Sequence, residues 1–270
     1  MSGLRSVVLV TGLFACLACS SSDDSSKGDD GGSGGGGGSG GGGGSGMKGP
    51  PTTTTDTFET AHDGVYHLGP VDFAESQYHN ACAPGGGYVS ALRESVGLSG
   101  EYLAGVSGEL SQNGGVCDAC ILIETAEGES IVARVVTYGQ EHSPGDIDVS
   151  PSVFEAINHG EDPRTMTWHF ARCPEVGGLQ YEFKSGSNPF WTSLWVRNPR
   201  VPLVKAEVKA KGDTDFVTLE RAGDGTLTDS SGFGDGAFTL RLTGLDGQVV
   251  EDELPGFAAG QLVQSQKQFE

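Results

Sequence analysis

Basic residues are scarce in this chain of 270 residues: 16 Lys and Arg stand against 36 Asp and Glu, and the formal net charge is −20. Such an acidic chain repels the phosphate backbone of nucleic acids and the surface of anionic membranes. Both classes of ligand are therefore disfavoured. The charge favours solubility and neutral or cationic partners, but it does not identify one.

The apolar run near the N-terminus, residues 7–17, is too short to span a bilayer. It follows a short basic start and precedes small residues and a polar tail, which is typical of a secretory signal peptide. Cys19 at its exit predicts a lipoprotein-type signal over residues 1–19 with Cys19 acylated. Cys16 is the alternative acylation site, and an ordinary cleaved signal is the other alternative. We expect a protein that is lipid-anchored at the bacterial cell surface or outer membrane, or secreted.

Residues 20–56 hold almost no apolar side chain that a core could bury. They are rich in Ser, Asp and Gly, with a Gly/Ser run over residues 31–46 and a Pro/Thr stretch after it. This composition predicts a disordered tether, stiffer at its Pro/Thr end. The membrane would then be contacted only through the N-terminal lipid.

Four cysteines follow the tether, and their even number in an exported chain predicts two disulfides. Cys117 and Cys120 form a CxxC, but no second CxxC or close His pair completes a zinc site, and the βαβ context of a redox motif is lacking. We therefore expect no metal and no cofactor. The four are Cys82, Cys117, Cys120 and Cys173.

Helical signals are also few. Residues 57–175 contain short β-branched and partly alternating runs, which predict strands and, with two disulfides, a small barrel. The clearest helix is expected over 151–159, with Ser150 as N-cap, Pro151 in the first turn and Gly160 past the end. A second short helix is predicted over 88–97.

Residues 176–270 contain strand-like runs separated by Gly/Asp turns, and this pattern predicts an antiparallel β-sandwich. The expected strands are 179–184, 192–197, 203–209, 215–219, 237–243 and 248–254.

The stretch 187–199 concentrates aromatic residues, with Phe190, Trp191 and Trp195 close together. In a strand, alternation sends Leu194 to one face and both Trp to the other. That second face suits stacking on a flat ligand such as a sugar ring. Burial of both Trp in a sandwich covered on both sides is the open alternative.

Three patches resemble bacterial expansin-like proteins. They are Gly145-Asp-Ile-Asp-Val-Ser-Pro151; Phe190-Trp191 with Val196-Arg-Asn198; and Ser231-Gly-Phe-Gly-Asp-Gly-Ala-Phe-Thr239 with the strand after it. The resemblance implies a mainly β protein: a six-stranded double-psi β-barrel over 57–175, followed by an immunoglobulin-like, cellulose-binding β-sandwich over 176–270. It also implies loosening of plant cell walls without hydrolysis, by a monomer that is not an enzyme.

The same resemblance implies site residues. The disulfides become Cys82–Cys117 and Cys120–Cys173, and Asp148 becomes the acid of a barrel groove. Phe190, Trp191 and Lys184 become the polysaccharide-binding platform of the second domain. Here Gly223-Asp-Gly225 stands where the family has a platform Tyr, and Trp195 is the candidate substitute.

The predicted groove departs from the family in several positions. The strand over 131–137 ends in Thr137 and Tyr138 without the second Asp that related barrels carry, and Tyr138 matches the groove Tyr only with a shift of one residue. His67 replaces a groove Thr. Asp146 and Glu141 are nearby acids that match no motif position.

Two other functions stay open. Glycoside hydrolysis normally uses two carboxylates, so the missing one weakens a β-glucan hydrolase. A peptidoglycan lytic transglycosylase needs a single acid, which Asp148 would supply. A surface carbohydrate adhesin with a degenerate groove is the third interpretation. Cellulose, another cell-wall polysaccharide or peptidoglycan is the expected partner.

Overall fold

The computed structural model describes residues 56–69, 71, 81–82, 102–139, 143–174 and 177–270. All of them belong to one compact unit, Met47–Glu270. The predicted signal peptide with Cys16 and Cys19, the tether up to residue 55, the helix expected over 88–97 and Glu141 lie outside the described residues. In the part that is described, no helix has the length and apolar character needed to cross a membrane.

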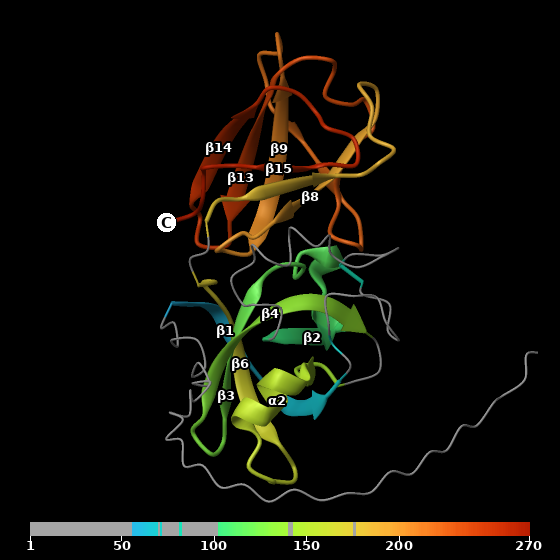
Figure 1. Cartoon of the computed structure of the whole chain (residues 1–270). Coiled ribbons are helices and arrows are strands. Elements are labelled where there is room, and N and C mark those ends of the chain that lie inside the picture. The colour runs from blue at the N-terminus through green and yellow to red at the C-terminus, as the bar shows by residue number, and fades with distance from the viewer. Residues whose placement is uncertain (1–55, 70, 72–80, 83–101, 140–142, 175–176) are drawn as a thin grey trace, which may run out of the picture. The chain divides into compact units, whose positions relative to one another are not determined.

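The first strands close into a six-stranded barrel, which confirms the predicted fold class (Figure 1). The strands are β1 (Thr57–Leu68), β2 (Leu103–Ser107), β3 (Cys120–Thr125), β4 (Ser130–Gly139), β5 (Ile147–Val149) and β6 (Thr165–Ala171). Their order around the barrel is β1-β5-β2-β4-β3-β6. The β1–β5 and β2–β4 pairs are parallel, and the other neighbours are antiparallel.

The barrel closes around apolar side chains that alternate along the strands. Trp168 on β6 is fully buried, stacks on His62 with ring centroids 4.3 Å apart, and donates its indole N–H to the Gly145 carbonyl at 2.9 Å. Burial of such side chains stabilises the barrel by about 25 cal/mol per Å² of apolar surface. Other members of the core are Tyr66, Ile121, Ile123, Ile131, Val135 and Phe170.

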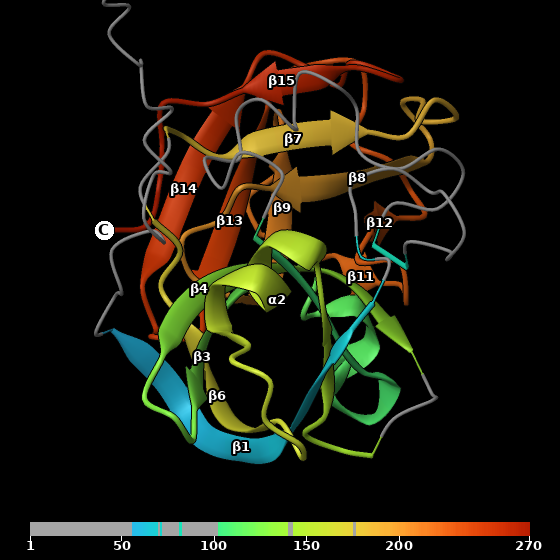
Figure 2. The ribbon, with the colours of Figure 1, turned by 60° about the horizontal axis from the view of Figure 1, so that its bottom comes forward.

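The predicted helix is present but shorter than expected. It is α2 (Pro151–Ile157), shown in front of the barrel strands in Figure 2. Ser150 precedes it without a side-chain cap, because its hydroxyl accepts a hydrogen bond from the Leu103 N–H at 3.2 Å instead. Asn158 adopts extended dihedrals of φ −94° and ψ 122°, which ends the helix before His159. Two short 3₁₀ turns, η1 (Gly108–Leu110) and η2 (Gln112–Gly114), precede β3.

The remaining strands form the two predicted sheets of a sandwich. They are β7 (Gln180–Phe183), β8 (Thr192–Arg197), β9 (Leu203–Ala210), β10 (Val217–Thr218), β11 (Glu220–Arg221), β12 (Leu227–Asp229), β13 (Phe238–Gly244), β14 (Val249–Leu254) and β15 (Leu262–Gln264). One sheet has the order β10-β9-β13-β14 and the other β11-β12-β8-β7-β15. Phe183, Phe233 and Phe238 pack between them.

The single strand expected over 215–219 is wrong. β10 pairs with β9 in the first sheet, whereas β11 pairs with β12 in the second, so the chain changes sheets at Leu219. Leu219 is 5% exposed and packs in the core of the sandwich. A single continuous strand in the first sheet would not bring the Leu219 side chain into the core in this way. The short strands β2, β5, β11, β12 and β15 are not predicted by the sequence pattern.

Two disulfides are formed, Cys82–Cys117 and Cys120–Cys173, in the pairing that the resemblance implies. Their Cα atoms are 5.4 and 5.2 Å apart, the ordinary range for a disulfide. The first places Cys82 beside Asp118, and the carbonyl of Cys82 accepts a hydrogen bond from Arg197 of β8 at 3.0 Å. This disulfide therefore supports a contact between the barrel and the sandwich.

Buried arginines make that contact. Arg197 is fully buried; its guanidinium donates to the Asp118 carboxylate at 2.8 Å and to the Glu182 carboxylate at 2.7 Å. Arg134 of β4, also fully buried, donates to the Asp118 carbonyl at 2.8 Å and to the Asn198 side chain at 3.4 Å. Within the Val196-Arg-Asn198 motif, Arg197 and Asn198 therefore bind the barrel.

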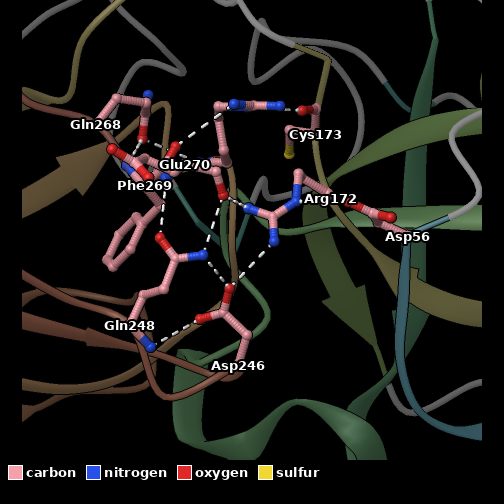
Figure 3. A network of polar contacts seen from close by, with 9 residues as sticks. Asp56, Arg172, Cys173, Asp246, Gln248, Gln268, Phe269 and Glu270 are labelled. Atoms are coloured by element: carbon pink, nitrogen blue, oxygen red, sulfur yellow. Dashed lines mark hydrogen bonds and ion pairs between the residues drawn. The ribbon is translucent and has the colours of Figure 1, made fainter.

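A second polar network ties the end of β6 to the last residues (Figure 3). Arg172 contacts the carboxylates of Asp56 at 3.0 Å and Asp246 at 3.2 Å, and donates to the main-chain oxygen of Glu270. Gln248 donates to Asp246 at 2.7 Å and to the Glu270 oxygen at 3.0 Å. These contacts hold residues of the barrel, the β13–β14 turn and residue 270 together.

Candidate functional site

The Phe190–Trp191 pair lies on a tight turn that leads into β8. The Asn188 carbonyl accepts from the Trp191 N–H at 3.1 Å, and the Asn188 side chain accepts from the Phe190 N–H at 3.0 Å. Pro189 takes the second position of the turn, where its fixed φ is favoured. The turn leaves the Phe190 side chain 79% exposed and Trp191 37% exposed.

Gly232 packs against the outside of this turn. Its φ is +74°, and a Cβ there would lie 2.2 Å from the Pro189 carbonyl oxygen and 2.6 Å from the Trp191 nitrogen. Only glycine permits this dihedral and approach without strain. The Gly234 N–H also donates to the Pro189 carbonyl at 3.0 Å. The 231–239 patch therefore supports the turn that displays the two rings.

A hollow of about 450 Å³ lies beside Trp191. Trp195 also lines it but is only 9% exposed. Its indole N–H donates to the Asp224 carbonyl at 2.8 Å, and the Lys184 ammonium and Arg197 guanidinium lie over its ring at 5.1 and 4.8 Å from the centroid. Trp195 thus forms a packed wall, whereas Trp191 keeps open ring surface.

The loop at Gly223-Asp-Gly225 contributes an acid to this region. The Asp224 carboxylate contacts the Lys184 ammonium at 2.9 Å and accepts from the Thr226 N–H at 3.0 Å. Burial alone would raise the pKa of Asp224, but the hydrogen bonds from Thr226 and Lys184 outweigh it and hold that pKa below its usual value. Asp224 therefore stays ionised beside Lys184.

The barrel brings three of the predicted groove residues into one row. Asp148 on β5 pairs in register with His67 on β1 and with Gly105 on β2, and Gly105 pairs with Thr137 on β4. A Cβ at Gly105 would lie 2.8 Å from the Thr137 methyl group and 3.8 Å from the Asp148 Cβ. The missing side chain lets Thr137 and Asp148 approach each other. We call His67, Asp148 and Thr137 the Asp148 row.

Two contacts fix the sides of the Asp148 row. The Thr137 hydroxyl accepts from the Ala81 N–H at 3.2 Å. On the other side, Asp146 lies 3.9 Å from the His67 ring nitrogen and accepts from the Val65 N–H at 2.8 Å. The Asp146 side chain is 17% exposed, so this acid mainly holds β1.

Tyr138 lies apart from the Asp148 row, because neighbouring residues of a strand point to opposite faces. Its hydroxyl donates to the Gly223 carbonyl, in the loop that carries Asp224. Burial raises the pKa of Tyr138, and the nearby charge of Asp224 adds to this. Tyr138 therefore links the barrel to the loop beside Lys184.

The Tyr138→Phe variant tests this link. It removes one hydrogen bond and leaves the Gly223 carbonyl without that donor, so we expect a loss of about 1 kcal/mol in unfolding free energy. Denaturant unfolding at neutral pH measures it. Because the raised pKa keeps Tyr138 neutral, its contribution is present below the usual tyrosine pKa and falls as pH rises through the folded-state value. An equal loss at high and neutral pH would contradict this role.

Among the described residues, no group of three or more His, Cys, Asp or Glu side chains is placed to hold a metal ion. The described residues instead offer three kinds of group to a ligand. They are the exposed rings of Phe190 and Trp191, the carboxylate of the Asp148 row with its hydroxyl and imidazole neighbours, and the Lys184–Asp224 pair.

Sequence comparison finds no matching family model. Expansin-YoaJ of Bacillus subtilis (strain 168) is 29% identical over 134 residues, 49% of this chain and 56% of the relative. Expansin-like protein 3 of Dictyostelium discoideum is 23% identical over 207 residues, 74% of this chain and 61% of the relative. These matches thus span little more than half of each relative's length.

Solved structures give the same family name. The crystal structure of apo Clavibacter michiganensis expansin has a TM-score of 0.62 at 19% identity, covering 78% of this chain and 98% of that chain. An Asp-to-Asn mutant of the Clavibacter protein in complex with cellohexaose has a TM-score of 0.61 at 20% identity. This chain therefore has the fold of the Clavibacter expansin and is similar in sequence to expansin-like proteins.

The sequence pattern does not reveal two features of the site. In the sequence Asp224 stands out only as a departure from a family Tyr, because its partner Lys184 is 40 positions away. The contact of Tyr138 with Gly223 joins residues 85 positions apart and has no local signal.

Proposed function

We propose that this expansin-like protein binds cell-wall polysaccharide of the cellulose or matrix-glucan type and loosens it without hydrolysis. One observation carries the proposal: Phe190 and Trp191 are displayed side by side, 79% and 37% exposed, next to a hollow. Exposed flat rings of this kind stack on the apolar faces of sugar rings. The cellohexaose complex of the Clavibacter expansin mutant supports the ligand class.

Asp148 is the proposed acid of the loosening step. Its carboxylate is partly exposed between His67 and Thr137, where it can accept hydrogen bonds from sugar hydroxyls. Such bonds replace those that hold neighbouring polysaccharide chains together. Its partners in the row are an imidazole and a hydroxyl, and Asp146 is engaged by the Val65 N–H. This arrangement favours a non-hydrolytic role over a pair of catalytic carboxylates.

The proposed location of the protein is outside the cell. The signal over residues 1–19, lipidation at Cys19 and the tether over 20–56 would hold the barrel (57–175) and sandwich (176–270) away from a membrane. Two disulfides suit an oxidising compartment. The protein would act as a monomer and without a cofactor.

The Asp148→Asn variant tests the proposed function. Asn keeps the size of the side chain but removes the charge, so we expect weakening of wet filter paper to fall about tenfold or more. Binding to cellulose, measured by depletion from solution, is expected to stay within about twofold of wild type. Asp213→Asn, on the exposed turn after β9, makes the same change of charge and is the control. Weakening that survives Asp148→Asn removes Asp148 from the mechanism.

One observation favours an enzyme as a second candidate. Asp148 is a partly exposed carboxylate in the Asp148 row, and a lytic transglycosylase needs only one acid. A β-glucan hydrolase would release reducing ends from glucan, and a lytic transglycosylase would release soluble muropeptides from peptidoglycan. Incubation with each polymer distinguishes these activities from loosening.

A further inference from the structure

The hollow beside Trp191 contains charged groups that are already paired. Lys184 is the cation among its described lining residues, and its ammonium lies 2.9 Å from the Asp224 carboxylate. Glu182, also in the lining, is paired with Arg197 at 2.7 Å. Both charged side chains of the lining, Lys184 and Glu182, therefore already contact a group of opposite charge.

Asp224 is held so that it stays with Lys184. One carboxylate oxygen accepts from the Thr226 N–H at 3.0 Å and the other contacts Lys184. The Asp224 side chain is 18% exposed and that of Lys184 is 32% exposed, so water screens the pair only partly. The Asp224 carbonyl also accepts from the Trp195 indole N–H at 2.8 Å, which fixes the backbone beneath the carboxylate.

We propose that Asp224 determines specificity: by holding the Lys184 ammonium, it restricts this site to uncharged polysaccharide and excludes chains that carry carboxylates, such as polyuronates. The inference rests on the proposed function, because it concerns the polysaccharide that the Trp191 site accepts.

The selection follows from electrostatics. A uronate carboxylate that approaches Lys184 also approaches Asp224, and the repulsion cancels the attraction. To bind, it must displace Asp224 and leave that carboxylate partly buried without its cation. A neutral sugar meets no such cost, because it can stack on Trp191 without disturbing the Lys184–Asp224 pair. Repulsion of the wrong ligand is a general route to specificity.

The test compares binding to microcrystalline cellulose and to immobilised polygalacturonate, at low and high salt. The wild-type full chain is expected to bind cellulose and to show little retention on polygalacturonate. In Asp224→Asn the Thr226 acceptor is kept but Lys184 is released, so binding to polygalacturonate is expected to rise about fivefold or more at low salt and to vanish at high salt. Binding to cellulose is expected to change by less than about twofold.

Two control variants test whether a gain in polygalacturonate binding comes from the release of Lys184. Asp213→Asn changes the net charge equally on an exposed turn and is expected to behave like wild type. The double variant Lys184→Gln/Asp224→Asn removes the released cation and is expected to lose the gain.

The role of Asp224 is contradicted if Asp224→Asn binds polygalacturonate no better than wild type does. It is also contradicted if the gain in polygalacturonate binding persists in the double variant or appears equally in Asp213→Asn. A wild type that binds both polymers equally well contradicts it as well. Failure of wild type to bind cellulose instead contradicts the proposed function. The polygalacturonate comparison still decides the role of Asp224 in that case.

Discussion

An Arg197→Ala variant is expected to lose about 3–5 kcal/mol of unfolding free energy, the usual cost of removing one partner of a buried ion pair. The guanidinium is fully buried and contacts Asp118 of the barrel at 2.8 Å and Glu182 of β7 at 2.7 Å. Its loss leaves the Asp118 carboxylate, itself 2% exposed, without that cation. Against a typical stability of about 5–15 kcal/mol, this is a large fraction.

Denaturant unfolding of the purified protein measures the Arg197 effect. Lys205→Ala is the matched control, because the Lys205–Glu207 pair is equally short at 2.8 Å but the lysine side chain is 47% exposed. We expect the control to lose less than about 1 kcal/mol. Arg197→Lys keeps the charge without the forked geometry and should fall between the two. Equal losses for Arg197→Ala and Lys205→Ala would show that Arg197 does not join barrel and sandwich.

Replacing Trp191 by alanine is expected to weaken cellulose binding about tenfold or more, which corresponds to about 1.4 kcal/mol. Trp191 offers open ring surface beside the hollow, and stacking on a sugar ring buries that surface. Phe190→Ala is expected to give a similar loss, since Phe190 is the most exposed ring of the pair. Depletion of protein by microcrystalline cellulose, measured as an isotherm, gives the affinities.

Val217→Ala is the control for the Trp191 measurement. Val217 is 51% exposed and lies in the other sheet of the sandwich, so binding is expected to be unchanged. Trp195→Ala is expected to lower stability, because its indole is packed against Lys184, Arg197 and the Asp224 carbonyl. Full binding by Trp191→Ala, together with abolished binding by a folded Trp195→Ala, would reverse the roles assigned to the two rings.

Local pattern predicted most of the strands, because their alternation and turn residues are encoded within a few positions. The change of sheet at Leu219 was not predictable, since a buried leucine in a short β-branched run looks the same in either sheet. Helix α2 was predicted, but not its capping. Ser150 bonds to Leu103, which lies 47 positions away.

The site was predicted unevenly for the same reason. Alternation placed Trp191 and Trp195 on one side of a strand, but only the tertiary contacts of Lys184 and Arg197 distinguish the open ring from the covered one. Asp148, His67 and Thr137 were named from motif positions. Their arrangement in one row depends on the parallel β1–β5 and β2–β4 pairings, which no local pattern reveals.

Loosening of polysaccharide without its hydrolysis can be tested by measuring two quantities on the same filter paper. One is the force needed to break the wet paper, and the other is the soluble and insoluble reducing sugar formed during the incubation. Wild-type protein is expected to lower the breaking force while reducing sugar stays at the level of a protein-free control. Reducing sugar that rises in proportion to the weakening would contradict it and identify the protein as a glycoside hydrolase.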